Sequence, residues 1–311
     1  MNEERVIAQA GSSPTGSLAG FGPACWPAVY EPEGPSKGRV VLVHLYPREM
    51  SIYGDLGNTR VLQQRLVRHG YTCEVRAHAP GAPFPTDAHL VFGGGGQDSG
   101  QARVEEDLAR IAPQLRALAD DDVPMLMICG MYQLFGNAFV TTTGQRLPGL
   151  GILDVTTTGG ANRMIGPIVM RTRYGEVVGY ENHSGRTVLG PGQAAFGEVL
   201  HGSGNNPTDG SEGAVVRAVH GTYLHGPLLP ANPAVADGLI AAAVERALGR
   251  PFEPAVLDDS LAEAARTRQI RRLLAQGRDA HPARRALRKA GDRLRAVRSG
   301  GEPRNRTQTT I

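Results

Sequence analysis

Short apolar runs alternate with longer amphipathic stretches along the first half of the chain. The apolar runs, which predict buried strands, cover residues 39–46, 72–76, 88–92 and 124–128. Between them, residues 58–69 and 104–119 repeat apolar positions at helical spacing and predict helices. Strands that alternate with helices in this way predict an α/β fold, with a mostly parallel sheet flanked by helices.

The pattern changes after residue 150. Short strand-like segments separated by glycine-rich turns follow, as in GILDVTTT and MRTRYGEVVGY. A last helix is predicted over residues 233–248, where Asn232 occupies the N-cap position, Pro233 the first turn and Gly249 the position just past the end.

Composition divides the chain into three parts. Residues 1–36 are rich in Gly, Pro and Ser and predict a flexible leader, in which Trp26 and Tyr30 could still dock on the body. Residues 37–250 form the predicted main domain, and residues 251–311 a basic tail, helical with breaks at Gly277 and Pro282 and then disordered. No apolar run approaches the roughly 20 residues of a membrane span, and no signal peptide is recognisable, so we expect a cytoplasmic protein.

The net charge of +3 hides an asymmetry between the body and the tail. Residues 250–311 hold 15 of the 33 Lys and Arg but only 7 of the 30 Asp and Glu. A basic helix suits nucleic acid, an anionic membrane surface or an acidic partner, and it can also be a solvated appendage. No aromatic residue follows Phe252 to stack on bases, so we expect no nucleic-acid binding and keep a weak contact with anionic membranes open.

The candidate nucleophile is one of three cysteines. Cys25, Cys73 and Cys129 are odd in number and share no CxxC spacing, which argues against a disulfide framework, and we predict no metal site. Cys129 ends the apolar run MLMI and is followed at once by Gly130. A sharp strand-to-helix turn there exposes a nucleophile and places a helix N-terminus beside its thiolate, although a cysteine at a strand end is also common packing.

Two further segments fit chemistry at Cys129. His225 lies in a glycine-flanked turn, HGTYLHG, where an imidazole can act as general base, although it could equally be a core or surface residue. FGGGGQDSG follows a predicted strand, and its glycines leave backbone N–H groups accessible to a ligand. Its spacing fits neither a dinucleotide fingerprint nor a P-loop, so an oxyanion-binding loop is the better interpretation.

These motifs carry a family resemblance. CGMYQ around Cys129 and GTYLHG around His225 resemble the class I, triad-type glutamine amidotransferases of the cobyric acid synthase-like branch. VHLYPREMSIYGDLGN, FGGGGQD, ANRMIGP and GYENHSGRT are similar in the same order, over about residues 37–250. Within that branch, the motifs look most like the glutaminase subunits of lipid II isoglutaminyl synthases.

The resemblance implies a role for each matching position. Cys129 would attack the glutamine side-chain amide with His225 as base, and Arg163 in ANRMIGP would bind the glutamine carboxylate. The implied oxyanion donors are the backbone N–H groups of Gly94, Gly95 and Gly130. Gln133 could line the substrate pocket or face the helix interior, and Glu181 and His183 are expected to be structural or at the edge of the site.

The implied function needs a second protein. A Mur-ligase-like partner, binding ATP and Mg²⁺, would activate the D-glutamate α-carboxyl of lipid II, while this chain supplies ammonia and needs no cofactor of its own. Alternatives are an amidotransferase for another carboxylate, such as a corrinoid side chain, and an inactive binding module. Many triad enzymes place a glutamate two residues after the histidine, where this chain has Pro227. We therefore expect an acid from the partner to complete the triad, with Glu181 as the internal candidate.

Overall fold

The computed structural model describes residues 22–279. The chain divides into two compact units, one that runs to Ile270 and one that begins at Arg271. The first unit contains both sheets and the candidate site, and the description below concerns it. Among the described residues, no helix is both long and apolar enough to cross a membrane.

A seven-stranded sheet forms the centre of the first unit, in the order β1-β3-β2-β4-β5-β13-β12. Its strands are β1 (Ala28–Tyr30), β2 (Arg39–Leu45), β3 (Thr72–His78), β4 (Leu90–Gly93), β5 (Met125–Ile128), β12 (Ala214–Val216) and β13 (Val219–Thr222). The pairs of β2 with β3 and β4, of β4 with β5 and of β5 with β13 are parallel, and the two edge strands are antiparallel. The predicted mostly parallel α/β sheet is therefore confirmed.

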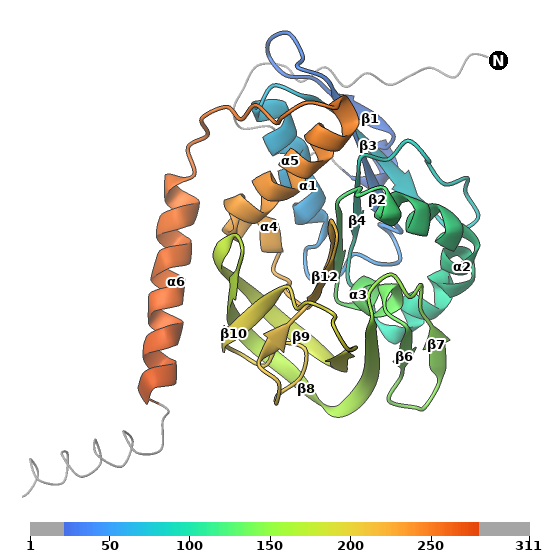
Figure 1. The fold of residues 1–311 in the computed structure, drawn as a ribbon, viewed down its shortest axis with the longest axis vertical. Helices are drawn as coiled ribbons and strands as arrows, with labels where there is room; N and C mark the ends of the chain where they lie inside the picture. Colours follow the sequence, from blue (N-terminus) through green and yellow to red (C-terminus); the bar gives the residue numbers. More distant parts are fainter. Residues whose placement is uncertain (1–21, 280–311) are drawn as a thin grey trace, which may run out of the picture. The chain divides into compact units, whose positions relative to one another are not determined.

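Helices cover both faces of this sheet (Figure 1). The described helices are η1 (Pro23–Cys25), α1 (Leu56–Arg68), α2 (Asp98–Asp120), α3 (Gly130–Phe135), α4 (Leu228–Ala231), α5 (Pro233–Leu248) and α6 (Ser260–Asp279). α1 and α5 lie on one face, and α2 and α3 on the other. α2 begins six residues before the predicted start, because the glycine loop after β4 leads straight into its first turn.

A second sheet is built from the strand-like segments after residue 136. Its strands are β6 (Ala138–Val140), β7 (Arg146–Pro148), β8 (Val155–Thr172), β9 (Gly175–Leu189), β10 (Gly197–His201) and β11 (Ser211–Glu212). β8 and β9 form a long antiparallel hairpin whose register shifts between Gly159 and Met164. The hairpin carries ANRMIGP on one strand and YENHSG on the other, so these motifs face each other across it.

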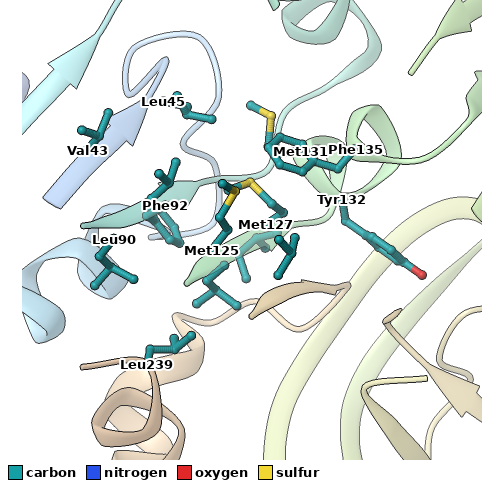
Figure 2. Packing of buried hydrophobic residues seen from close by; sticks show 14 of the residues in the cluster. Val43, Leu45, Leu90, Phe92, Met125, Met127, Met131, Tyr132, Phe135 and Leu239 are labelled. Atoms are coloured by element: carbon teal, nitrogen blue, oxygen red, sulfur yellow. The ribbon is translucent and has the colours of Figure 1, made fainter. Parts of the chain in front are cut away.

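The core lies between the central sheet and its helices. Figure 2 shows Leu90, Phe92, Met125 and Met127 at its centre, with Met131 on the α3 side and Leu239 on the α5 side. The strands carry near-continuous apolar runs because helices bury both of their faces. This packing fixes the strand ends from which the site residues project.

Helix α5 matches its predicted bounds, but Asn232 acts differently from the expected cap. Its side chain makes no cap hydrogen bond. Instead it accepts from the N–H of Val178 and donates to the carbonyl oxygens of Val178 and Leu228. Asn232 thus joins the start of α5 to β9. Gly249 ends the helix in the left-handed conformation, as expected.

The predicted leader and tail are described only in part. Strand β1 lies within the stretch predicted as a leader and pairs with β3. In the predicted tail, α6 is a helix as expected, but it continues through Gly277 to Asp279 without the predicted break. Pro282 and residues 1–21 and 299–311 lie outside the described residues.

Candidate active site

The candidate site lies at the carboxyl ends of the parallel strands, where parallel α/β sheets bind ligands. The chain leaves β5 into Cys129 and leaves β13 toward His225. The loop after β2 carries Asp55, just before α1, and the glycine loop follows β4. A Cβ added to Gly95 in that loop would lie 2.5 Å from Cε1 of His225, 3.2 Å from Oδ2 of Asp55 and 3.3 Å from Cβ of Cys129. These three side chains therefore converge around one glycine.

Cys129 has the strained backbone of a sharp strand-to-helix turn. Its φ is 50° and its ψ is −103°, a conformation that costs a non-glycine residue about 1–3 kcal/mol. The turn is held because the N–H of Cys129 donates to the carbonyl of Thr222 at 2.8 Å. Cys129 is almost fully buried, at 6 % exposure, but it lines a pocket. This geometry favours a displayed nucleophile over simple packing.

His225 is paired with a carboxylate that the sequence analysis missed. Nδ1 of His225 lies 3.2 Å from Oδ1 of Asp55, and both side chains are fully buried. A carboxylate only accepts, so Nδ1 carries the proton and Nε2 is left for the thiol. The ring of Tyr53 packs edge-on against the imidazole, with 5.0 Å between centroids.

Electrostatics favour the protonated form of His225. Burial alone would lower the pKa of His225, but the negative charge of the Cys129 thiolate and the hydrogen bond to Asp55 outweigh it. Together they raise the pKa of His225 to about 10. A cationic imidazole beside a sulfur is the arrangement from which a cysteine can act as nucleophile.

An acid of this chain therefore lies where the third member of a triad would lie. The sequence analysis expected a partner protein to place an acid there, whereas in the structure Asp55 occupies the Nδ1 side of His225. Glu181, the earlier internal candidate, accepts instead from the backbone N–H groups of Ser203 and Gly204. Pro227 does not offer an acid but starts α4, and the loop that carries Asp55 packs against it.

The glycine loop differs in detail from the prediction. The N–H of Gly95 donates to Oδ2 of Asp55 at 2.6 Å, so it is not free for an oxyanion, and the expectation for Gly95 is corrected. Gly94 packs against the carbonyl of Met50. Gly96 lines the pocket beside Cys129, and a Cβ on Gly130 would lie only 3.0 Å from the backbone N of Gly96. Gly96 and Gly130 are thus the adjacent backbones beside the sulfur.

Arg163 lies at the same pocket, which has a volume of about 540 Å³. Its Nε donates to Oδ1 of Asn182 at 3.1 Å, and its Nη2 donates to Oδ1 at 2.8 Å and to the carbonyl of Asn182 at 2.9 Å. The guanidinium is exposed, yet Asn182 fixes its plane. The Nη1 donors of Arg163 bind no described residue and suit a ligand carboxylate.

Gln133 fits both interpretations that the sequence left open. It lines the pocket, and it is 5 % exposed. Its Oε1 accepts from Gln101 at 2.8 Å, and its Nε2 donates to the hydroxyl of Tyr223 at 3.1 Å. The Tyr223 hydroxyl in turn lies 2.6 Å from that of Thr187. Gln133 therefore belongs to a buried hydrogen-bond chain that forms the pocket wall.

Comparison with known proteins agrees with this geometry. The model of the CobB/CobQ-like glutamine amidotransferase domain matches residues 41–233. The subunit GatD of lipid II isoglutaminyl synthase (glutamine-hydrolyzing) from Staphylococcus aureus is 38 % identical over 223 residues, covering 71 % of this chain and 90 % of that protein. The GatD subunit from Streptococcus pneumoniae is 33 % identical over 226 residues, covering 71 % and 87 %.

More distant similarities are shorter or weaker. A probable cobyric acid synthase from Methanoculleus marisnigri is 33 % identical over 185 residues, covering 53 % of this chain but only 35 % of that protein. Among solved structures, a glutamine amidotransferase aligns with a TM-score of 0.46 at 15 % identity, covering 66 % of this chain and 98 % of that one.

Proposed function

Because the chain belongs to the CobB/CobQ-like glutamine amidotransferase family, we propose that it hydrolyses glutamine and supplies ammonia to a separate synthetase. The observation that carries this proposal is the convergence of Cys129, His225 and Asp55 beside a pocket that also contains Arg163. An inactive binding module would have no reason to keep a strained cysteine next to a carboxylate-paired histidine.

Acylation begins with the thiolate of Cys129. Its sulfur attacks the side-chain amide carbon of glutamine, and the carbonyl oxygen becomes an oxyanion that the N–H groups of Gly96 and Gly130 can stabilise. The protonated His225 then gives its Nε2 proton to the leaving nitrogen, so ammonia departs and a γ-glutamyl thioester remains. Asp55 keeps the imidazole oriented and offsets its charge throughout.

Deacylation uses the same groups with water as the nucleophile. Neutral His225 accepts a proton from the water as the oxygen attacks the thioester carbon. The thiolate of Cys129 leaves, glutamate is released, and the imidazolium–thiolate pair is restored. Arg163 binds the α-carboxylate in both steps through its free Nη1 donors.

The acceptor is proposed from the relatives. GatD proteins are named as glutamine-hydrolysing subunits of lipid II isoglutaminyl synthase, and the match covers most of their length. We therefore favour a Mur-ligase-like partner that binds ATP and Mg²⁺ and amidates the D-glutamate α-carboxyl of lipid II. A corrinoid carboxylate is the second candidate, although the cobyric acid synthase is matched over only a third of its length.

The test is glutamate release from L-glutamine by the full chain and its variants. Cys129→Ala should abolish release, because it removes the nucleophile that the proposed mechanism requires. Cys25→Ala, which removes an exposed thiol, is the matched control and should leave the rate unchanged. Substantial hydrolysis by folded Cys129→Ala would refute the assignment.

The acceptor needs a second measurement. The chain is mixed with its candidate synthetase, ATP, Mg²⁺, glutamine and either lipid II or a corrinoid acid, and amide formation is followed by mass spectrometry. Amidated lipid II that depends on Cys129 supports the first candidate. Amidation of the corrinoid alone would replace it with the second.

A further inference from the structure

We propose that His183 binds the α-ammonium group of the substrate glutamine through its Nε2 nitrogen, an assignment that rests on the proposed function. His183 lies on β9 and lines the pocket that also contains Cys129 and Arg163. It therefore belongs to the wall of the pocket in which a glutamine with its amide at Cys129 and its carboxylate at Arg163 would lie. The sequence analysis expected His183 to be structural or at the edge of the site, and neither role accounts for its unpaired Nε2 nitrogen.

The hydrogen bonds of His183 fix which of its nitrogens carries the proton. Nδ1 lies 2.9 Å from the carbonyl oxygen of Gly185, which can only accept. Nδ1 must therefore donate, and in a neutral ring Nε2 is left as an acceptor. Burial and the nearby positive charges of His225, Arg163 and Arg186 lower the pKa of His183 to about 3, so the ring is neutral at physiological pH.

This acceptor has no partner within the described chain. The side chain of His183 is 3 % exposed, and Nε2 makes no hydrogen bond to any described residue. The nearest carboxylate, that of Glu181, lies 4.0 Å away and is itself an acceptor. A buried acceptor without a donor is costly, so a ligand that brings an N–H group recovers that cost.

Two contacts hold the ring in its orientation, the hydrogen bond of Nδ1 to Gly185 and a stack on Tyr223. The ring stacks on Tyr223 with 3.6 Å between centroids and 2° between planes. Tyr223 is itself held by its hydrogen bonds with Gln133 and Thr187. His183 is thus a pre-oriented acceptor, which is what recognition of one substrate group requires.

The ligand group that fits is a cationic N–H donor. The carboxylate of Glu181, 4.0 Å from Nε2, offsets part of the positive charge of His225, Arg163 and Arg186, and Arg163 already suits the substrate carboxylate. Glutamine presents one such cation, its α-ammonium group. Asp98 also lines the pocket and could bind an ammonium, but it is exposed at the start of α2, where water screens its charge.

The test compares L-glutamine with glutaramate, which has the same amide and carboxylate but no amino group. The full chain should hydrolyse glutaramate with a kcat/KM about 10- to 100-fold lower, the range for losing one charge-assisted hydrogen bond. Replacing a side chain that contacts the amino group should lower kcat/KM for glutamine but not for glutaramate.

Two replacements of His183 form a matched pair. Asparagine can place an amide N–H near the position of Nδ1 but has no group at Nε2, whereas glutamine can place an amide oxygen there. His183→Asn should lower kcat/KM for glutamine to about the glutaramate value and leave glutaramate nearly unchanged. His183→Gln should keep most of the discrimination, although both variants lose the same ring stacking.

Several results would overturn the assignment. Equal losses on both substrates in His183→Asn, with a native melting temperature, would mean that His183 is structural or acts on the leaving ammonia. Loss of discrimination in Asp98→Asn, with discrimination intact in His183→Asn, would move the ammonium site to Asp98. If the unmodified chain hydrolysed neither compound, the glutaminase function itself would fail, and the assignment of His183 with it.

Discussion

Asp55 serves two parts of the candidate site with one buried carboxylate. Oδ1 accepts from Nδ1 of His225, and Oδ2 accepts from the N–H of Gly95. The same side chain therefore orients the base and fixes the glycine loop that leads to Gly96. Removing its charge should disturb catalysis more than substrate binding, because Asp55 does not line the pocket.

We expect Asp55→Asn to lower kcat for glutamine hydrolysis by about 10²–10⁴-fold, with a smaller change in KM. The amide keeps the size of the carboxylate but cannot stabilise the imidazolium, and loss of the equivalent acid in other triad enzymes has effects of this order. Steady-state kinetics of the full chain with L-glutamine measure both parameters.

The partner protein provides the decisive comparison for Asp55. If Asp55 is the third member of the triad, the defect of Asp55→Asn persists when the synthetase subunit is added. Recovery to the rate of the unmodified complex would show that an acid of the partner takes this position instead. Glu181→Gln is the control, and it should leave the orientation of His225 unaffected.

At the scale of elements, the triad depends on how closely two loops approach. Gly57, in the first turn of α1, packs against Pro227, which starts α4 just after His225. A Cβ added to Gly57 would lie 2.7 Å from Cγ and 3.2 Å from Cβ of Pro227. Asp55 and His225 can thus come together because Gly57 has no side chain at the place where the ring of Pro227 lies.

Gly57→Ala should therefore destabilise the protein and slow hydrolysis. Helix propensity alone predicts a gain of up to about 1 kcal/mol, but the overlap with Pro227 costs about 1–3 kcal/mol, so the steric effect should win. Denaturant unfolding and glutaminase assays measure the two effects. Adding Pro227→Ala removes the closest atom and should restore part of the loss, whereas strictly additive effects would contradict this contact.

The sequence predicted those features that depend on local pattern. Apolar runs located the central strands, and proline with glycine bounded α5. Cys129 and His225 could be found because Cys129 directly follows β5 and His225 lies three residues past the end of β13. Asp55 was missed because it lies 170 residues from His225 and ten residues past its own strand. Only the strand order could have located Asp55, because the carboxyl ends of β2, β4, β5 and β13 lie at one edge of the sheet and bring the loops after them together.

Some errors came from side chains that serve tertiary contacts. Asn232 occupies an N-cap position, but its amide is used by β9 and α4 instead. The backbone N–H of Gly95 was expected to be free for an oxyanion, but it donates to the carboxylate of Asp55. Local sequence pattern cannot predict either hydrogen bond, because each partner comes from a distant segment of the chain.

At the scale of the whole molecule, charge is concentrated in the C-terminal part of the sequence. Residues 250–311 carry a net charge of +8, and 280–311 alone contain nine Lys and Arg but two Asp and Glu. If the tail holds the enzyme near anionic lipid, at about 1 kcal/mol per engaged basic residue, a chain ending at Asp279 should lose vesicle binding. Co-sedimentation with phosphatidylglycerol vesicles measures this.

The control for the shortened chain is glutamine hydrolysis, which should be unchanged because the site lies in residues that remain. Neutral phosphatidylcholine vesicles and high salt should both weaken binding of the full chain. Equal binding of the full and shortened chains to anionic vesicles would leave the tail as a solvated appendage.

The stability of the whole protein should depend on pH through buried groups that oppose one another. Burial lowers the pKa of His44 and of His183 to about 3. Burial and the nearby charge of Arg173 lower the pKa of His220 to about 4. The unfolded chain then binds more protons than the native one between about pH 4 and 6.5, so these histidines make stability fall as the pH falls. A buried glutamate, Glu212, has the opposite effect, because its contribution to stability rises as the pH falls.

Glu212 is fully buried beneath β13, where its Oε1 accepts from the hydroxyl of Thr222 and the N–H of Tyr223. Burial outweighs these bonds and raises the pKa of Glu212 to about 7. Between about pH 4.5 and 7 the native state therefore binds more protons than the unfolded chain, and this contribution to stability falls as the pH rises.

Glu212→Gln keeps the acceptor but cannot ionise, so the variant should match the unmodified protein near pH 4.5. Above pH 7 it should be more stable, by on the order of 3 kcal/mol. Urea unfolding of both proteins across this range measures the difference, and a constant offset at every pH would mean that Glu212 ionises normally in the folded protein.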